Sequence, residues 1–308
     1  MLCWFNWVVA RRVSMAKPLS SHERLEKSLT DFYQGQLPGP IPKKWEKFSD
    51  LAILPEMSFP KEVWGDSGDL WTIVAAALQV QRIARMGEVR GNFRESGVEL
   101  LLGDDDWIIR KEHGIEFGYH FTKCMWSSGN VTERGRIANT DYSGERVLDL
   151  YAGIGYYTLP FLSEGARGPN GQRGKGRSAK HVVACEWNPS AIDCLRWSLS
   201  RNGVADKCTI IEGDNRNTEF EPIFDRVNLG LLPSSEEGYG TAIEALKPTG
   251  GIMHVHGLAI AGKEEEKSRE IAAQLTGLGN FECDVNNVEF VKWYAPHKRH
   301  IVVDITAR

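Results

Sequence analysis

The 308-residue sequence has no excess of charge of one sign, a feature that would mark a general nucleic-acid binder. Its net charge is −4, from 37 Lys and Arg residues against 41 Asp and Glu residues. A basic protein is attracted to RNA over its whole surface, whereas this chain would need a local basic patch. Hydrophobic residues make up 42% and charged residues 25%, values that are ordinary for a globular chain of one to three domains.

The sequence also lacks paired cysteine spacings and long apolar runs. None of its six cysteines forms a C-x-x-C pair or a Cys/His cluster with zinc spacing, so we expect reduced thiols and no metal site. Reduced thiols favour the cytoplasm, with the nucleus and the mitochondrion as alternatives. The apolar residues 2–10 are too few to cross a bilayer, and no secretory signal pattern surrounds them. We therefore expect no membrane contact and assign no function to residues 1–18.

Apolar periodicity divides the rest of the chain into two predicted domains. Residues 19–141 begin with a helix, contain an amphipathic helix over 70–87 and continue in short alternating strands, which predicts a small α+β domain. In residues 142–308, short runs rich in Val, Ile and Leu alternate with helical patterns, as in a mostly parallel sheet with crossover helices. Residues 281–308 predict two strands that form an antiparallel hairpin at the edge of this sheet.

One insertion interrupts the second predicted domain. Residues 164–180 contain five glycines and five basic residues but a single acid, Glu164. Such a segment cannot bury a core, so we predict a flexible loop. Two interpretations stay open: a solvated linker between a helix and a strand, or a contact to RNA phosphates.

The stretch "VLDLYAGIGYYTLPFL", residues 147–162, predicts a ligand-binding loop. Gly153 and Gly155 follow a buried strand and precede a helical pattern, and glycine lets a ligand approach the backbone closely. The stretch is not G-x-G-x-x-G, because Thr158 occupies the third glycine position, and no G-K-[ST] follows as in a phosphate-binding P-loop. The pattern therefore disfavours a pyrophosphate or a triphosphate.

Acidic residues end three successive predicted strands, at Asp149, Glu186 and Asp214. The carboxyl ends of parallel strands meet at one edge of the sheet, where open α/β folds bind ligands. Glu186 is placed to accept from ribose hydroxyls, and Asp214 with Asn215 is placed to accept from an adenine amino group. For each acid alone, a helix cap is the simpler explanation. Together they favour a nucleoside, and the absence of a phosphate cradle suits S-adenosyl-L-methionine.

At this point the chain resembles a known family, the tRNA wybutosine-synthesizing protein 2 family, which is related to the tRNA guanine-37 N1-methyltransferases. The resemblance rests on ordered segments from about residue 20 to the end, among them "FTKCMWSSGNVTERGRIA", "ACEWNPSAIDCLRWSLSRNGV", "DRVNLGLLPSSEEGY" and "YAPHKRHIVVDI". It implies the class I S-adenosylmethionine-dependent, Rossmann-like methyltransferase fold after a small α+β domain. The motifs "SSGN" and "NLGLLPSS" favour the wybutosine branch over the methyltransferases.

The resemblance also implies an activity. The 3-amino-3-carboxypropyl group of S-adenosylmethionine would pass to C7 of 4-demethylwyosine at position 37 of phenylalanine tRNA, releasing methylthioadenosine. A guanine-37 N1-methyltransferase is the first alternative, and a catalytically inactive RNA-binding subunit is the second. Ser127, Arg134, Glu186, Asp214 and Asn215 match the family's cofactor-contacting positions, and we predict that Arg134 pairs with the cofactor's carboxylate.

Further residues are predicted near the transfer site and at the RNA contact. We place Ser127 and Asn228 near the transfer site, and the sequence identifies no general base. Trp126, Tyr156 and Trp293 could stack on a flipped purine, with core packing as the alternative for each. The candidate RNA-binding residues share a positive charge and a place in basic or hairpin segments: Arg82, Arg85, Arg90, Arg94, Arg173, Lys175, Arg177, Lys298 and Arg299.

Overall fold

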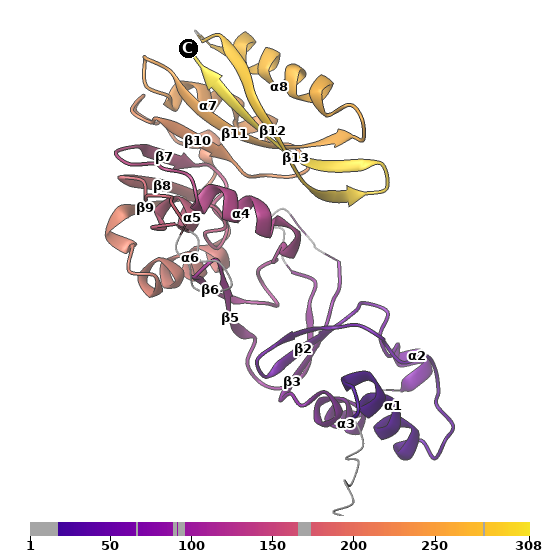
Figure 1. The fold of residues 1–308 in the computed structure, drawn as a ribbon. Coiled ribbons are helices and arrows are strands. Elements are labelled where there is room, and N and C mark those ends of the chain that lie inside the picture. Colours follow the sequence, from indigo (N-terminus) through magenta and orange to yellow (C-terminus); the bar gives the residue numbers. More distant parts are fainter. Residues whose placement is uncertain (1–17, 66, 89–90, 92–95, 166–173, 280) are drawn as a thin grey trace, which may run out of the picture. The chain divides into compact units, whose positions relative to one another are not determined.

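The computed structural model describes residues 18–308 except residues 66, 89–90, 92–95, 166–173 and 280 (Figure 1). The chain forms two compact units. The first holds Met1–Met86 and Glu99–Asp104, and the second holds Gly87–Val98 and Asp105–Arg308. The domain division at residue 141 that the sequence suggests stays a prediction. In the part of the chain that is described, no helix is both long enough and apolar enough to span a membrane.

The first unit is a four-stranded sheet with helices packed against it. Its strands lie in the order β1-β2-β3-β4, and the elements are α1 (Ser21–Phe32), β1 (Glu46–Phe48), β2 (Leu51–Leu54), α2 (Lys61–Trp64), α3 (Gly68–Leu78), β3 (Arg82–Arg85) and β4 (Glu99–Leu102). The predicted first helix is confirmed. Its start is a capping box, in which Ser20 Oγ accepts from Glu23 N at 3.2 Å and Glu23 Oε2 accepts from Ser20 N at 2.6 Å.

The helix expected over residues 70–87 is shorter, and that prediction is wrong at its C-terminal end. α3 stops at Leu78 because Gln79 takes a left-handed conformation with φ of 56°. The following residues form β3, which pairs in parallel with β2. Ile83 and Ala84 are fully buried in this strand. The apolar spacing fits a helix or a short strand, and only pairing with a distant segment decides between them.

The second unit is built on a seven-stranded sheet in the order β12-β13-β11-β10-β7-β8-β9. The strands are β7 (Arg146–Asp149), β8 (His181–Glu186), β9 (Cys208–Glu212), β10 (Arg226–Leu229), β11 (Gly251–Ile260), β12 (Cys283–Ala295) and β13 (Lys298–Ala307). Five strands run parallel, while β13 is antiparallel to both β11 and β12. The predicted mostly parallel sheet with a C-terminal antiparallel hairpin is confirmed.

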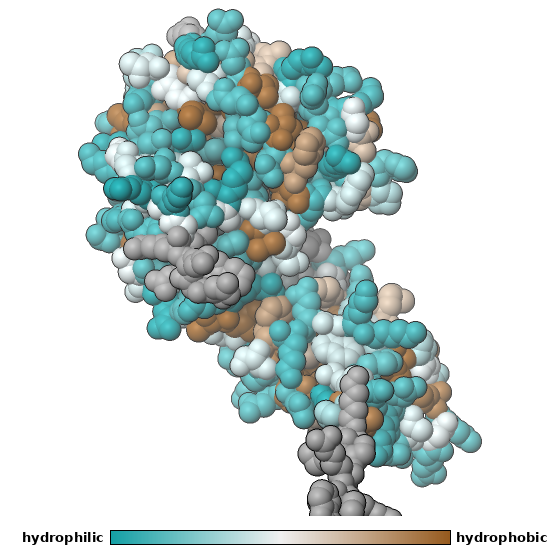
Figure 2. Space-filling view, viewed as in Figure 1, coloured by the Kyte–Doolittle hydropathy of each residue, from teal (hydrophilic) through white to brown (hydrophobic). Residues whose placement is uncertain are grey.

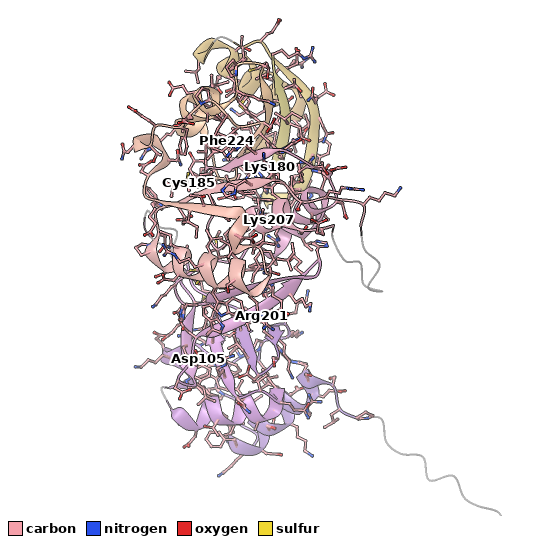
Figure 3. The ribbon with its side chains drawn as sticks, turned by 90° about the vertical axis from the view of Figure 1, so that its left-hand side faces the viewer. Asp105, Lys180, Cys185, Arg201, Lys207 and Phe224 are labelled. Atoms are coloured by element: carbon pink, nitrogen blue, oxygen red, sulfur yellow. The ribbon has the colours of Figure 1, made fainter. Side chains whose placement is uncertain are left out.

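Helices cover both faces of this sheet, with α4, α5 and α6 on one face and α7 and α8 on the other (Figure 1). Their bounds are α4 (Val131–Ala138), α5 (Thr158–Leu162), α6 (Pro189–Arg201), α7 (Tyr239–Ala245) and α8 (Glu264–Leu278), and a two-stranded ladder of β5 (Trp107–Glu112) and β6 (Ile115–His120) precedes them. Asn188 caps α6 by accepting from Ser190 N at 3.0 Å, as the Asn-Pro pair predicts. Figure 3 shows Cys185 in the sheet and Arg201 at the end of α6.

One hydrophobic core of the second unit lies between the sheet and helices α7 and α8. Leu148, Val227 and Val255 are fully buried there against Leu275 of α8. On the visible face of each unit hydrophilic side chains predominate, with smaller hydrophobic patches between them (Figure 2). Burial of this apolar surface is the main force that holds the parallel strands in register. The strand ends, and the loops that follow them, are thereby fixed in place.

A chain of charged side chains ties α4 to the sheet. Asp304 accepts two hydrogen bonds from the Arg136 guanidinium, at 2.7 and 3.0 Å, and one from His254 Nδ1 at 2.5 Å. Arg136 also pairs with the fully buried Glu133 at 2.7 Å. Burial alone would raise the pKa of Asp304, but His254 and Arg136 hold it well below its usual range. These bonds fix α4, which carries Arg134, against β11 and β13.

A second buried pair makes stability depend on pH. His256 and His300 share a hydrogen bond of 3.0 Å, and burial, helped by the Lys292 ammonium, lowers the pKa of His300 from 6.5 to about 4. Between these values the unfolded chain binds a proton that the folded chain does not, so the free energy of unfolding should fall as the pH is lowered through that window. One such residue contributes a slope of at most about 1.4 kcal/mol per pH unit.

Replacing His300 with Gln should therefore reduce the slope of stability against pH between pH 6.5 and about pH 4, while His254 and His256, whose pKa values burial also lowers, keep their own contributions. Urea unfolding at several pH values measures the slope for both proteins. Above pH 7 the two curves should run parallel, because there the imidazole is neutral in both states. A variant whose slope below pH 6.5 equals that of the wild type would contradict this assignment.

Candidate cofactor pocket

A cavity of about 610 Å³ opens at the carboxyl ends of the parallel strands in the second unit. It is lined by the glycine loop after β7, by Glu186 after β8, by Asp214 and Asn215 after β9 and by Gly230 after β10. Residues before the sheet also contribute, notably Ser127. The carboxyl edge of an open α/β sheet is where such folds bind ligands.

The glycine loop takes conformations that favour glycine at both positions. Gly153 has φ of 56° and Gly155 has φ of 97°. Gly153 N points to the next strand and donates to Glu186 Oε2 at 2.6 Å. A Cβ on Gly155 would lie 2.9 Å from Leu195 Cδ1 of α6 and 3.1 Å from Leu159. The second glycine therefore lets the loop pack tightly against α6, while the first presents backbone to the cavity.

A Gly155→Ala variant should be less stable than the wild type by about 1–3 kcal/mol, from the left-handed conformation and the tight contact with Leu195. Gly144→Ala is the matched control, because Gly144 has φ of 84° but open space around its Cβ position. Urea unfolding of both proteins should give a larger loss at Gly155. An equal loss at the two positions would show that packing against α6 does not matter.

Glu186 is the acid that contacts both the loop and the cavity. Its Oε2 accepts from Gly153 N at 2.6 Å, and its Oε1 accepts from Trp187 N at 3.0 Å and Asn188 N at 2.8 Å. Burial raises the pKa of Glu186, and these backbone donors act against that shift. The carboxylate thus holds the loop in place and presents acceptor oxygen to a ligand with hydroxyl groups.

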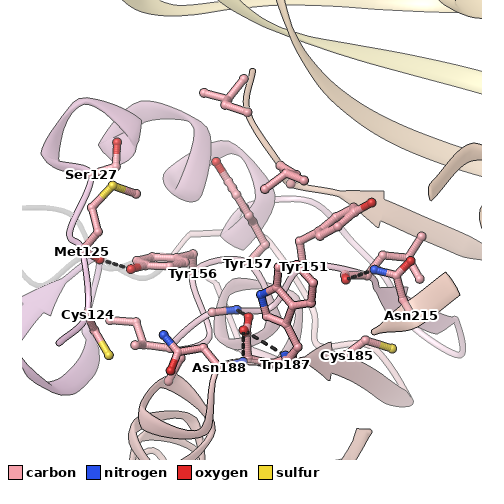
Figure 4. A pocket seen from close by; sticks show the side chains of 18 of the residues that line it. Cys124, Met125, Ser127, Tyr151, Tyr156, Tyr157, Cys185, Trp187, Asn188 and Asn215 are labelled. Atoms are coloured by element: carbon pink, nitrogen blue, oxygen red, sulfur yellow. Dashed lines mark hydrogen bonds between the residues drawn. The ribbon is translucent and has the colours of Figure 1, made fainter. Parts of the chain in front are cut away.

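Asp214 and Asn215 line the cavity beside β9. Figure 4 shows Asn215 at the opposite end of the cavity from Ser127. Asn215 is buried, and its Nδ2 donates to Leu150 O at 2.9 Å. Its Oδ1 accepts no hydrogen bond among the described residues. A buried acceptor without a partner is costly, so a ligand amino group would stabilise it. Asp214 instead pairs with Arg216, which lowers the pKa of the Asp214 carboxyl.

Two residues predicted at the site lie behind the loop. Asp149 is fully buried and accepts from Thr158 Oγ1 at 2.7 Å and from Asn228 Nδ2 at 2.9 Å. Neither Asp149 nor Asn228 is among the described residues that line the cavity. Their geometry makes them supports that join β7, β10 and the start of α5. Direct roles in cofactor binding for Asp149 and near the transfer site for Asn228 stay predictions.

Arg134 forms its hydrogen bonds with other residues of the protein and does not border the cavity. Its guanidinium donates to both carboxylate oxygens of Glu112, at 2.5 and 2.9 Å, and to Ser127 O at 3.1 Å. The side chain is 1% exposed and lies 4.5 Å from the centre of the Trp126 ring. Arg134 is not among the described residues that line the cavity. Its predicted pairing with a cofactor carboxylate stays a prediction, and in this geometry it holds the backbone of Ser127.

The sequence interpretation missed Lys292 and Tyr294, two residues of β12 that line the cavity. Lys292 Nζ donates to Ser127 Oγ at 2.6 Å across 165 residues of sequence. The hairpin motif "YAPHKRHIVVDI" was interpreted as a sheet edge, as a candidate RNA contact and as a segment of the family resemblance, but not as part of the cofactor site. The motif begins with Tyr294 and follows Lys292 by two positions, and this was the one signal available.

Two family models match the chain between residues 25 and 277. The TRM5/TYW2 methyltransferase domain matches residues 108–277, and the TYW2 N-terminal domain matches residues 25–106. The chain belongs to the TRM5/TYW2 family. It is 42% identical over 275 residues to the tRNA wybutosine-synthesizing protein 2/3/4 of Arabidopsis thaliana, covering 87% of this chain and 26% of that protein. It is 44% identical over 227 residues to the tRNA wybutosine-synthesizing protein 2 homolog of Homo sapiens, covering 73% and 48%.

Solved structures of the TRM5/TYW2 family share the fold. The TYW2 of P. horikoshii in complex with MeSAdo has a TM-score of 0.74 and 26% identity, over 92% of this chain and 98% of that one. The TYW2 of M. jannaschii in complex with AdoMet has a TM-score of 0.65 and 26% identity, over 86% and 99%. This chain spans about a quarter of the length of the two plant relatives.

The aromatic residues predicted to stack on a base have different surroundings in this TRM5/TYW2 chain. Trp126 packs in a cluster of rings, 5.7 Å from Tyr119 and 5.8 Å from Tyr156, measured between centroids. Tyr156 lines the cavity and donates its hydroxyl to Met125 O (Figure 4). Trp293 is 60% exposed on the hairpin. Core packing thus describes Trp126 well, and a stacking role stays a prediction for all three.

The basic residues predicted to bind RNA differ in their ion pairs and in their exposure. In the first unit, Arg82 pairs with Asp50 at 2.9 Å and Arg85 pairs with Glu99 at 2.7 Å. Arg299 pairs with Glu264 at 3.2 Å and lies over the Trp293 ring. Lys175, Arg177 and Lys298 are exposed, whereas Arg90, Arg94 and Arg173 lie outside the described residues. No group of three or more potential metal ligands occurs within the described ranges.

Proposed function

We propose that this chain transfers the 3-amino-3-carboxypropyl group of S-adenosylmethionine to C7 of 4-demethylwyosine at position 37 of phenylalanine tRNA. The observation that carries the proposal is the cavity beside β8 and β9, where Glu186 and the unpartnered Asn215 Oδ1 suit ribose hydroxyls and an adenine amino group. Similarity to proteins named for wybutosine synthesis supports the choice of the transferred group and of the acceptor.

The reaction joins C7 of the base to the γ-carbon of the aminocarboxypropyl group. The bond between that carbon and sulfur breaks, the electron pair stays on sulfur, and methylthioadenosine leaves while the C7 proton passes to solvent. The sulfonium supplies the activation, so the protein acts mainly by holding both reactants in line. We assign this orientation to the glycine loop, Glu186 and Asn215, and we assign no general base.

Binding of the tRNA substrate requires a local basic surface, because the chain as a whole carries no net positive charge. We propose that the exposed Lys175, Arg177 and Lys298, with Arg299 of the hairpin, contact phosphates. The five described cysteines are free thiols, as expected in a reducing compartment, and we place the activity in the cytoplasm. In this proposal residues 142–308 supply most of the cofactor contacts and residues 19–141 form the accessory domain.

The by-product distinguishes the candidate functions. Purified protein is incubated with S-adenosylmethionine and with tRNA that carries 4-demethylwyosine, and the released nucleosides are separated by chromatography. Methylthioadenosine, formed only when the tRNA is present, is the expected product. S-adenosylhomocysteine would instead identify a methyltransferase, and neither nucleoside would identify an inactive RNA-binding subunit.

A further inference from the structure

We propose that Lys292 and Ser127 form the binding site for the α-carboxylate of the donor's aminocarboxypropyl group. The inference rests on the proposed function, because it takes S-adenosylmethionine as the ligand of the cavity. S-adenosylmethionine carries adenine at one end and an amino acid at the other. Figure 4 shows Asn215 and Ser127 at opposite ends of the cavity, with Tyr151, Tyr156 and Tyr157 between them.

The amino-acid end of the ligand needs a cation. Two basic side chains line the cavity among the described residues, Arg216 and Lys292. Arg216 lies at the Asn215 end and is paired with Asp214 at 2.5 Å and with Glu237. Arg134, the cation that the sequence suggests, is held by Glu112 behind Ser127. Lys292 is thus the cation at the Ser127 end that borders the cavity.

The surroundings of Lys292 fix its ammonium group. Nζ donates to Ser127 Oγ at 2.6 Å, Ser127 Oγ donates to Asn130 Oδ1 at 3.2 Å, and Asn130 Nδ2 donates to Tyr157 Oη at 3.4 Å. All four residues line the cavity. Arg134 adds two hydrogen bonds to the backbone oxygen of Ser127. Because these hydrogen bonds already hold the ammonium group, it loses little conformational entropy when a ligand binds. The ammonium and the neighbouring hydroxyl can both donate hydrogen bonds to a carboxylate.

The turn that contains Gly129 lies directly against the side chain of Lys292. A Cβ at Gly129 would collide with Lys292 Cδ, and it would also lie 3.2 Å from Lys292 Nζ. The motif "SSGN" therefore supplies a hydroxyl at Ser127, a gap at Gly129 and an amide at Asn130 for one side chain from the C-terminal hairpin. A carboxylate bound there fixes the far end of the group that is transferred, while Asn215 fixes the adenine.

Two nucleosides test the site, because methylthioadenosine shares the adenosine of S-adenosylmethionine but lacks the carboxylate. In calorimetry with the full chain, Lys292→Met should bind S-adenosylmethionine about tenfold more weakly, the loss of one charge-assisted contact. Its affinity for methylthioadenosine should stay at the wild-type value. Lys292→Arg should recover part of the lost affinity. Lys263→Met, a change at an exposed lysine before α8, is the control and should alter neither affinity.

A second variant guards against a general folding defect. Gly129→Ala keeps the lysine but obstructs its path, and it should show the same selective loss for S-adenosylmethionine. Equal loss for both nucleosides, or no loss for either, would overturn the carboxylate site. The proposed function fails separately, because release of S-adenosylhomocysteine in the transfer assay would contradict it whatever Lys292 binds.

Discussion

Replacing Glu186 with Ala should weaken S-adenosylmethionine binding by about 1–3 kcal/mol, or roughly 5- to 160-fold. Two contributions add. The variant loses the carboxylate oxygens that face the cavity, and it leaves Gly153 N, Trp187 N and Asn188 N without their acceptor. The glycine loop then loses the bond that holds it against β8. Methylthioadenosine affinity should fall as much, because both nucleosides share the ribose.

Glu212→Ala is the matched control for this experiment. Glu212 pairs with Glu186 in the register of β8 and β9, but it is exposed and bonded to Arg196. Calorimetry should give wild-type affinity for this control and reduced affinity for the Glu186 variant. Unchanged affinity after Glu186→Ala would remove this residue from the site.

Replacing Asp149 with Ala should lower the free energy of unfolding by about 2–6 kcal/mol. The carboxylate is fully buried and accepts from Thr158 Oγ1 and Asn228 Nδ2. Its loss leaves both donors buried without a partner, at a cost of about 1–3 kcal/mol for each. Burial raises the pKa of Asp149, and the hydrogen bonds from Asn228 and Thr158 act against that shift.

Two further variants make the stability experiment specific. Asp149→Asn keeps one acceptor oxygen in place of the carboxylate, so urea unfolding should show a smaller loss than for Ala. Asp193→Ala removes a carboxylate that is 80% exposed on α6 and should change stability by less than about 0.5 kcal/mol. If Asp149→Ala proved as stable as the wild type, the support that we assign to Asp149 would be wrong.

The sequence predicted the parts of the site that depend on local pattern. The alternation of apolar runs and helices indicated the sheet, and acids at strand ends indicated the edge where Glu186 and Asn215 line the cavity. Local pattern could not distinguish a strand-end acid that faces the cavity from one that supports the loop. Asp149 and Glu186 both end strands, yet the first is fully buried and the second borders the cavity.

The sequence pattern could not predict contacts between segments that lie far apart in the chain. The sequence suggested that Arg134 pairs with a cofactor carboxylate, but its guanidinium donates to both carboxylate oxygens of Glu112 in β5. Lys292 reaches Ser127 from a strand 165 residues later. The end of α3 was misplaced for the same reason, because β3 exists only through its pairing with β2 and β4. In each case the deciding energy comes from a partner that no local window contains.

The most direct test of the central claim follows two labels from S-adenosylmethionine into phenylalanine tRNA. One label is placed in the carboxyl carbon and the other in the methyl carbon, and the purified protein acts on tRNA that carries 4-demethylwyosine. We predict that the carboxyl label enters the tRNA at position 37 and that the methyl label leaves with methylthioadenosine. Methyl label retained in the RNA as methylguanine, with the carboxyl label left in S-adenosylhomocysteine, would contradict the account.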